Sequence, residues 1–273
     1  MILFPNCKIN LGLNIVAKRP DGYHDIETVM VPVPWCDILE IVPSATGEVT
    51  LTTTGNRVDC PMEKNLVVKA YLAVAGRYEI PAVDIFLHKI IPDGAGLGGG
   101  SSDAAHMIMG LNQIFSLDMT DDEMCEIAAT IGADCPFFIH NRPRMATGIG
   151  TEFSDVDLDL GGLWIAVVKP DVSVPTKEAY AGVTPRSPEF NLEVSLAAPV
   201  ATWQSKVKND FEPGIFSLHP QVEEIKRCMI ECGAVYSAMS GSGSAVFGLF
   251  RSETDASVIK EKFEKNHSFI GKL

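Results

Sequence analysis

The chain has 273 residues, of which 46% are hydrophobic and 21% charged, and its formal net charge at pH 7 is −13. A chain of this length and apolar content can bury a core without metals or disulfides, and it is too apolar to be disordered. The acidic balance opposes a broad attraction to nucleic acid or anionic lipid, because such binding requires many phosphates to be neutralised. Any phosphorylated ligand must therefore be held by local donors.

The cysteines and the apolar segments indicate a cytoplasmic protein. The 7 cysteines are scattered and contain no C-x-x-C pair, so neither a disulfide framework nor a zinc site is predicted. Residues 1–5 lack the basic leader and long apolar region of a secretion signal. Apolar runs such as residues 163–168 are much shorter than the roughly 20 residues that a membrane-spanning helix needs. We expect no contact with a membrane.

The first quarter of the chain predicts a sheet, because short apolar and β-branched runs broken by Gly, Pro and Asp are typical of strands. These runs span residues 2–16, 28–42 and 49–54. Next, a helix is predicted over residues 65–78, with Asn65 as its cap, and a strand over residues 83–87. A glycine-rich loop follows this strand.

Two helices are predicted after the glycine loop, over residues 102–115 and from Thr120 to near Gly132, the second with a hydroxyl cap and acids in its first turn. The C-terminal part predicts strands over residues 163–168 and 245–250 and helices over residues 222–232 and 253–266. This order indicates a second α+β unit. We place a boundary near residue 155, which gives domains 1–155 and 156–273.

The glycine loop is the most informative segment, with five glycines in seven positions before two serines and a helix-forming stretch. It comprises Pro92, Asp93, Gly94, Ala95, Gly96, Leu97, Gly98, Gly99, Gly100, Ser101 and Ser102. Glycines adopt positive φ and expose backbone N–H groups, while a following helix N-terminus adds donors and a partial positive charge. The pattern favours an anion cradle for phosphate over the simpler alternative, a flexible turn.

Two common nucleotide motifs do not account for this loop. Gly94, Gly96 and Gly99 fit the spacing of the dinucleotide fingerprint, but a helix–helix connection follows instead of a βα unit with a terminal acidic residue. No Lys-Ser or Lys-Thr pair follows the glycines, which excludes a Walker A loop. The loop belongs to another kind of nucleotide site.

The loop resembles the hallmark of the GHMP kinases, Pro-x-x-x-Gly-Leu-Gly-Ser-Ser or a close variant. Other segments resemble further motifs of that family in the same order, with Cys7 as a small departure where Ala is usual. They are Cys-Lys-Ile-Asn-Leu-Gly-Leu at 7–13, Asp-Gly-Tyr-His at 21–24, Gly-Ala-Asp-Cys-Pro at 132–136 and Ser-Gly-Ser-Gly at 240–243. The resemblance implies an α+β fold, with an N-terminal domain like the second domain of ribosomal protein S5 and a C-terminal ferredoxin-like domain.

The resemblance also implies an ATP-dependent phosphotransferase that uses Mg²⁺. In the family's usual mechanism Asp134 would accept the proton of the acceptor hydroxyl, and Lys8 would orient that carboxylate. ATP would lie over the glycine loop, with its nucleoside near Asn65, Leu66 and Lys89. The metal ligands are unassigned apart from a candidate hydroxyl such as that of Ser102. Without the resemblance, these residues read as surface charges, a helix cap and a core side chain.

The extra glycines and the continuation Ser-Ser-Asp-Ala-Ala are similar to the branch of the family that phosphorylates 4-diphosphocytidyl-2-C-methyl-D-erythritol in the non-mevalonate isoprenoid route. A cytidine needs an aromatic surface and polar groups at its edge, which Tyr23, His24 and Tyr180 could provide. Asn10 and Thr176 are further candidates for substrate contacts. The simpler alternative makes the tyrosines half-buried core residues and His24 a turn residue.

Three other functions fit these motifs less well. A homoserine or mevalonate kinase would keep the loop but would not require aromatic residues for cytosine. A non-catalytic ligand sensor would be expected to have lost Lys8 or Asp134, and both are present. A nucleic-acid-binding module is opposed by the net charge and by the lack of a basic stripe. The resemblance implies a small-molecule substrate and no obligate protein partner.

Overall fold

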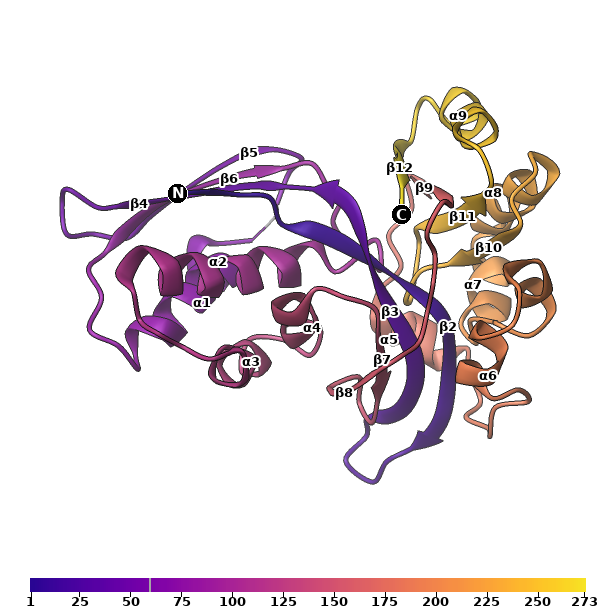
Figure 1. Cartoon of the computed structure of the whole chain (residues 1–273), viewed down its shortest axis with the longest axis horizontal. Helices are drawn as coiled ribbons and strands as arrows, with labels where there is room; N and C mark the ends of the chain where they lie inside the picture. The colour runs from indigo at the N-terminus through magenta and orange to yellow at the C-terminus, as the bar shows by residue number, and fades with distance from the viewer. Residues whose placement is uncertain (59) are drawn as a thin grey trace. The chain divides into compact units, whose positions relative to one another are not determined.

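The computed structural model of the chain describes residues 1–58 and 60–273. The chain forms two compact units, each built from several segments (Figure 1). Unit 1 comprises Met1–Cys7, Trp35–Asp93 and Gly98–Arg142, and unit 2 comprises Lys8–Pro34, Gly94–Leu97 and Pro143–Leu273. The segments of the two units alternate along the chain, so no single position separates them. The domain boundary near residue 155 stays a prediction.

Unit 1 is a four-stranded sheet with helices on one face (Figure 1). The strand order is β1-β4-β6-β5, antiparallel except for the parallel pair β5 and β6. The strands are β1 (Ile2–Leu3), β4 (Ile38–Pro43), β5 (Thr50–Gly55) and β6 (Val83–Lys89). The helices are the 3-10 helix η1 (Met62–Lys64), α1 (Leu66–Ala75), α2 (Gly99–Phe115), α3 (Asp121–Ala129) and α4 (Cys135–His140).

Local capping signals start two of these helices where the sequence predicts them. The Asn65 side chain accepts a hydrogen bond from the Val67 N–H and caps α1. Thr120 and Glu123 form a reciprocal capping box at the start of α3. Both predictions are confirmed.

Helix α2 begins at Gly99, earlier than the predicted start at residue 102, because Gly98 adopts a left-handed conformation with φ 69° as its N-cap. Tight packing accounts for the glycines of this helix. A Cβ atom at Gly99 would lie 3.0 Å from Ile91, and one at Gly110 would lie 2.6 Å from the Ile41 side chain of β4. The conformation of Gly98 therefore decides where the helix starts, and close packing limits which residues fit at Gly99 and Gly110.

Unit 2 contains two four-stranded sheets, with strand orders β2-β3-β7-β8 and β10-β11-β9-β12. The strands of the first are β2 (Asn6–Lys18), β3 (His24–Cys36), β7 (Arg144–Thr147) and β8 (Glu152–Asp155). Those of the second are β9 (Trp164–Lys169), β10 (Tyr236–Met239), β11 (Val246–Phe250) and β12 (His267–Lys272). The first residues of β2 and the last residues of β3 belong to unit 1.

The helices of unit 2 are α5 (Thr176–Ala181), α6 (Leu192–Leu196), α7 (Glu212–Leu218), α8 (Pro220–Glu231) and α9 (Glu253–Lys262), with the 3-10 helix η2 (Val200–Ser205). Helices α8 and α9 pack on the sheet that contains β9 and β11. The buried face of α8 presents Val222, Ile225 and Met229 to a core that also includes Leu13 of β2 and Phe250 of β11. This core joins β2 to the C-terminal part of the chain.

The predicted strands over residues 163–168 and 245–250 are confirmed as β9 and β11, and the predicted helix over residues 222–232 as α8. The helix predicted over residues 253–266 is confirmed as α9 but ends at Lys262. The strand predicted over residues 2–16 is interrupted near Pro5, which cannot donate a hydrogen bond to a sheet. The helix predicted over residues 65–78 ends at Ala75. The short elements β7, β8, β10, β12 and α4–α7 are not predicted from the sequence.

Two buried polar side chains hold the loop that follows β10. The Asn209 Nδ2 group donates hydrogen bonds to the carbonyl oxygens of Met239 and Gly241, each at 2.8 Å. The Glu212 Oε1 atom accepts a hydrogen bond from the Met239 N–H at 2.9 Å, and its Oε2 atom accepts one from Lys226 at 2.6 Å. These contacts hold the turn that carries Ser-Gly-Ser-Gly at 240–243, at Met239 and at Gly241.

The same loop lies directly against the glycine-rich loop within unit 2. The Ser240 hydroxyl donates a hydrogen bond to the Gly96 carbonyl oxygen at 2.9 Å. Gly96 has φ 73°, and a Cβ atom there would lie 2.1 Å from the Ser240 carbonyl oxygen. Only glycine fits at this position, because both the left-handed backbone and the backbone contact exclude a side chain.

We predict that Asn209→Ala lowers the free energy of unfolding by about 2–3 kcal/mol, because two buried carbonyl oxygens lose their donor. Urea unfolding measures this change. The exposed neighbour Lys206 provides a control, and Lys206→Ala should change the free energy by less than about 0.5 kcal/mol. Equal effects of the two substitutions would show that the loop does not depend on Asn209.

Candidate active site

A pocket of about 190 Å³ lies in unit 1, where α1 and α2 begin. It is lined by Val58, Cys60, Lys64, Asn65, Leu66, Leu87, Lys89, Asp93, Gly100 and Asp103. Five of these are residues predicted to bind the nucleotide, namely Asn65, Leu66, Lys89, Asp93 and Gly100. The structure therefore brings together residues from three separate parts of the sequence, as expected of a nucleotide site.

The base of this pocket contains a buried cluster of charges. The Lys89 ammonium donates hydrogen bonds to an Asp37 carboxylate oxygen and, at 2.6 Å, to Asp103 Oδ2. The other Asp37 oxygen accepts hydrogen bonds from the N–H groups of Ile90 and Ile91, at 2.6 and 2.8 Å. Asp37 therefore holds the chain where it leaves β6 and approaches the glycine loop. The sequence marks Lys89 as a candidate nucleotide contact. Asp103 stands in the Ser-Ser-Asp-Ala-Ala continuation of the glycine loop without a predicted role, and Asp37 stands in no motif.

The buried carboxyl group of Asp103 makes the protonation of this cluster unusual. Asp103 is only 2% exposed, and its Oδ1 atom has no hydrogen-bond partner among the described residues. Burial, together with the charge of Asp37, raises the pKa of Asp103 to about 7 against the attraction of Lys89. Burial alone would lower the pKa of Lys89, but the two carboxylates outweigh it and raise that pKa. Lys89 therefore stays charged, and Asp103 is the group that takes up a proton.

The glycine-rich loop passes from unit 1 to unit 2 and back. Pro92 and Asp93 lie in unit 1, residues 94–97 in unit 2, and residues 98–102 in unit 1 at the start of α2. Gly94, Gly96 and Gly98 all have positive φ, at 60°, 73° and 69°. Because Gly98 has no side chain to cap α2, the first N–H groups of the helix are available to an anion.

The two serines that end the loop point into the protein. The Ser101 hydroxyl forms a hydrogen bond with Cys135. Burial raises the pKa of Cys135 to about 11, although the hydrogen bond from Ser101 offsets part of this rise. Ser102 is fully buried, and its hydroxyl lies 3.3 Å from the Nδ1 atom of His106. Ser102 is therefore not among the residues that line the pocket.

In unit 2, the first motif lies beside the glycine loop. The Lys8 N–H donates a hydrogen bond to the Leu97 carbonyl oxygen at 2.9 Å. The Lys8 ammonium donates one to Asn10 Oδ1 at 2.6 Å, and Asn10 Nδ2 donates one to the Thr28 hydroxyl oxygen at 3.0 Å. Lys8, Asn10 and Thr28 are all buried. Burial of a charged side chain costs free energy, so packing alone does not explain a lysine at this position.

Two of the predicted aromatic residues, His24 and Tyr180, meet within unit 2. The rings of His24 and Tyr180 are stacked, with centroids 4.6 Å apart and planes inclined by 20°. Phe211 contacts the Tyr180 ring edge-on at 4.9 Å. Tyr23 is 62% exposed, and its backbone N–H is held by Asp21 at 3.0 Å. Thr176 is the first residue of α5, the helix that carries Tyr180.

Asp134 is the N-cap of α4 in unit 1 and is half-buried. Pro136 occupies one of the first two positions of this helix, where its missing N–H costs nothing. Lys8 belongs to unit 2, so the predicted pairing of Asp134 with Lys8 stays a prediction.

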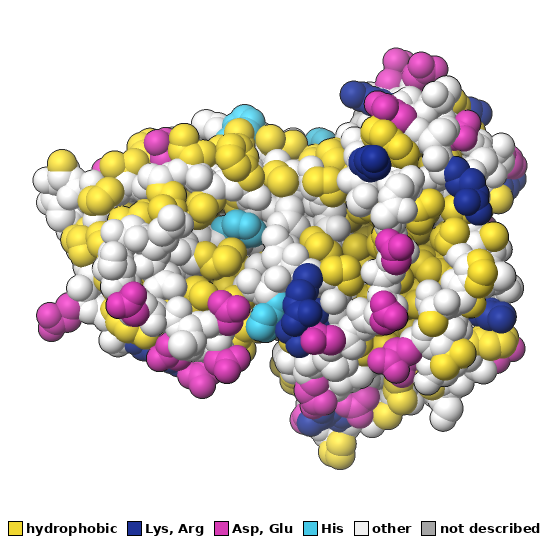
Figure 2. Space-filling view, in the orientation of Figure 1, with side chains coloured by type: hydrophobic (Ala, Val, Ile, Leu, Met, Phe, Trp, Pro, Cys, Tyr) yellow, Lys and Arg dark blue, Asp and Glu magenta, His cyan; other side chains and the backbone are white. Residues whose placement is uncertain are grey.

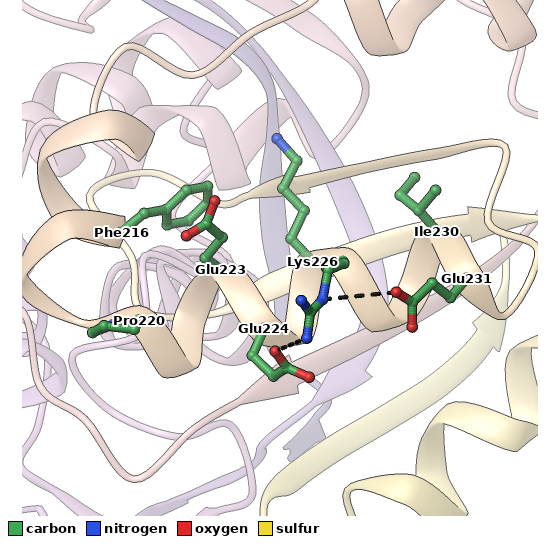
Figure 3. Close-up of a pocket in the computed structure, with 8 residues that line it drawn as sticks. Phe216, Pro220, Glu223, Glu224, Lys226, Ile230 and Glu231 are labelled. Atoms are coloured by element: carbon green, nitrogen blue, oxygen red, sulfur yellow. Dashed lines mark hydrogen bonds and ion pairs between the residues drawn. The ribbon is translucent and has the colours of Figure 1, made fainter.

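A larger pocket, of about 550 Å³, lies on α7 and α8 in unit 2 (Figure 3). Phe216 and Ile230 form part of its lining, and Arg227 forms ion pairs there with Glu224 and Glu231. The residues predicted to bind substrate or nucleotide lie elsewhere, so we do not assign this pocket to the reaction.

On the face drawn in Figure 2, Lys and Arg side chains stand in small separate groups among acidic ones. Within residues 1–58 and 60–273, no cluster of three or more His, Cys, Asp and Glu side chains is arranged to hold a metal ion. Over the same residues, each helix is too short or too polar to span a membrane.

Comparison with known proteins agrees with the geometry. The sequence matches the family described as GHMP kinases N terminal domain over residues 65–142 and the one described as GHMP kinases C terminal over residues 197–268. The N-terminal match includes the charge cluster residues Lys89 and Asp103, the glycine loop and Asp134. The predicted α+β GHMP kinase fold is confirmed.

Individual relatives give a finer classification. A 4-diphosphocytidyl-2-C-methyl-D-erythritol kinase from Parabacteroides distasonis is 56% identical over 254 residues, which cover 93% of each chain. One from Bacteroides fragilis is 49% identical over 275 residues, which cover 100% of each. A crystal structure of 4-(cytidine 5'-diphospho)-2C-methyl-D-erythritol kinase is 32% identical, with a TM-score of 0.85, over 99% of this chain and 98% of that one. The chain belongs to the GHMP kinases, and within them to the family of these erythritol kinases.

We predict that Asp103→Asn changes how stability depends on pH. The folded protein holds a proton on Asp103 up to a pKa of about 7, whereas an ordinary carboxyl loses it near 3.8. Asp103 therefore makes the free energy of unfolding fall as pH rises from 4 to 7, by up to about 1 kcal/mol per pH unit. Asparagine cannot ionise, so this fall should be absent from the variant.

Urea unfolding at pH 5, 6 and 7 measures the two slopes. Exposed Asp118 has a positive φ that Asn also accepts, and Asp118→Asn should keep the slope of the original protein. Identical slopes for the original protein and Asp103→Asn would show that Asp103 is ionised throughout this range.

Proposed function

We propose that this chain phosphorylates the 2-hydroxyl of 4-diphosphocytidyl-2-C-methyl-D-erythritol with ATP, in the non-mevalonate (methylerythritol phosphate) route to isoprenoid precursors. The observation that carries this proposal is full-length similarity, at 49% to 56% identity, to kinases named for that substrate. We also propose that the enzyme acts in the cytoplasm. The cysteines are thiols throughout the described part of the chain, which supports a reducing compartment.

ATP would bind with its phosphates on the glycine loop and its nucleoside in the pocket of unit 1. The positive φ of Gly94, Gly96 and Gly98 lets backbone approach the ligand closely, and the start of α2 adds N–H donors. The nucleoside would lie near Asn65, Leu66 and Lys89, which line the pocket. Asn65 Oδ1 caps α1, so Asn65 would donate a hydrogen bond to the ligand from its side-chain NH₂ group.

The donors of this pocket also suit a magnesium nucleotide. Mg²⁺ prefers oxygen ligands and retains several waters, and the carboxylate of Asp93 lines the pocket. The Ser102 hydroxyl suits it less well, because it is buried beside His106. Bound Mg²⁺ would neutralise negative charge on the phosphate oxygens.

The chemical step needs an aligned hydroxyl and an acceptor for its proton. We assign proton acceptance to Asp134 and electrostatic orientation of that carboxylate to Lys8, from their place in the family's motifs. Asn10 already holds Lys8. Its NH₂ group has a second proton and its oxygen a second lone pair, and these can contact the substrate.

The cytidine end of the substrate would be recognised by the aromatic residues of unit 2. His24 and Tyr180 already form a stacked pair, so cytosine can extend or enter a stack that the protein has organised. Tyr23 exposes most of its ring and can cover the base, while Thr176 at the start of α5 can supply a hydroxyl. Homoserine and mevalonate have no base to use these rings.

The substrate is tested by measuring ADP release from Mg-ATP with each of three alcohols: 4-diphosphocytidyl-2-C-methyl-D-erythritol, homoserine and mevalonate. We expect turnover with the cytidylyl compound alone. Turnover with either other alcohol would leave only the kinase class. ATP binding without turnover of any alcohol would favour a ligand sensor.

We predict that Asp134→Asn lowers kcat for the cytidylyl substrate by roughly 10²- to 10⁴-fold, because an amide cannot accept the hydroxyl proton. The KM for ATP should change little, because Asp134 is assigned to the chemical step. Asp118→Asn, an exposed substitution of the same kind, is the control. If kcat survives in Asp134→Asn, the general-base assignment is wrong.

We predict that Tyr180→Ala raises the KM for the cytidylyl substrate by roughly 10-fold or more, since stacking on a base contributes about 1–3 kcal/mol. Tyr180→Phe keeps the ring and should stay within about 3-fold of the original enzyme. Tyr180 also packs on the core of unit 2, so thermal unfolding must show that both variants are folded. An unchanged KM in folded Tyr180→Ala would remove Tyr180 from the cytidine site.

A further inference from the structure

A directed chain of hydrogen bonds ends at the Lys8 ammonium. The Thr28 hydroxyl donates to the Gly12 carbonyl oxygen at 2.5 Å. Asn10 Nδ2 donates to the Thr28 hydroxyl oxygen at 3.0 Å, and Asn10 Oδ1 accepts from Lys8 Nζ at 2.6 Å. All four residues belong to unit 2, on the adjacent strands β2 and β3.

The direction of this chain is set at the Gly12 end. A hydroxyl group has one proton, and Thr28 gives that proton to Gly12, so the Thr28 oxygen can only accept from Asn10. The atom of Asn10 that faces Thr28 must therefore be the NH₂ group, and its carbonyl oxygen must face Lys8. The opposite orientation of the amide would place its NH₂ group against the ammonium of Lys8.

Packing alone does not explain a threonine at this position. Thr28 is fully buried in β3 and is followed by Val29, Met30 and Val31, which are also buried. A valine has nearly the same shape and would avoid the cost of burying a hydroxyl group. The Thr28 hydroxyl group therefore has a role other than packing. The role that the structure shows is to orient the Asn10 amide.

We infer that Thr28 is a positioning residue for phosphoryl transfer, which fixes the Asn10 amide so that its oxygen holds the Lys8 ammonium. Thr28 does not touch the reacting atoms, and it acts through Asn10. This inference rests on the proposed function, because it gives Lys8 a part in the reaction.

The first test compares Thr28→Val with Thr28→Ser. The valine variant keeps the shape and loses the hydroxyl, so kcat should fall roughly 10-fold, with little change in the KM for ATP. This is less than the roughly 10²-fold loss that a displacement of about 1 Å of a catalytic group can cause. Thr28→Ser keeps the hydroxyl and should stay within about 3-fold of the original kcat. Thermal unfolding checks that both are folded, and Thr28→Cys, with a weak hydrogen-bonding thiol, replaces the valine variant if that one does not fold.

The second test is a double-mutant cycle with Asn10→Ala. If Thr28 acts only through Asn10, adding Thr28→Val to Asn10→Ala should cause no further loss of kcat. A further loss of roughly 10-fold in kcat of the double variant would overturn the inference. An unchanged kcat in the Thr28→Val single variant would also overturn it.

The third test does not depend on activity. The NMR signals of the Asn10 side-chain NH₂ group, assigned by their loss in Asn10→Ala, should exchange slowly with water in the original protein and in Thr28→Ser, and rapidly in Thr28→Val. Equal exchange in the original protein and Thr28→Val overturns the inference even if the chain has no kinase activity. Absence of turnover by the original protein, with the expected exchange, would instead refute the proposed function.

Discussion

The pocket of unit 1 is organised around one buried ammonium group, that of Lys89, shared between the carboxylates of Asp37 and Asp103. This cluster joins the residue before β4, the last residue of β6 and the second turn of α2. Removing the ammonium would leave two carboxylates buried without compensation, which is far more costly than the loss of a surface ion pair. Asp37 also holds the backbone N–H groups of Ile90 and Ile91, so the direction in which the chain enters the glycine loop follows from the same buried charges.

An acidic protein that binds a polyanion must solve an electrostatic problem locally. With a net charge of −13, the chain cannot rely on its overall field to attract phosphate. The glycine loop supplies backbone N–H groups and the start of α2, which attract an anion without any cationic side chain. The contact between Gly96 and Ser240 then limits the size of residue that either loop can accept. The donors are consequently organised by backbone conformation before a ligand arrives.

Unit 2 positions its functional groups through buried polar networks. Asn209 and Glu212 fix the loop after β10, and the hydrogen-bond chain from Gly12 through Thr28 and Asn10 ends on Lys8. A buried polar group without a partner costs free energy, so each network favours one arrangement over its alternatives. The stack of His24 on Tyr180 adds an apolar surface with a defined orientation beside these polar groups.

The sequence by itself determined the features that neighbouring residues encode: the glycine loop, the caps of α1 and α3, the family motifs and the longer periodic elements such as α8. Tertiary structure decided the rest. Lys89 reads from the sequence as an exposed charge, and only folding brings it to Asp37, 52 positions away. Asn209 has no motif of its own and meets Met239, 30 positions away, only because the intervening chain returns to it. Local signals act through the few residues of one turn, whereas these contacts form only when packing closes long loops and excludes the water that would otherwise satisfy the polar groups.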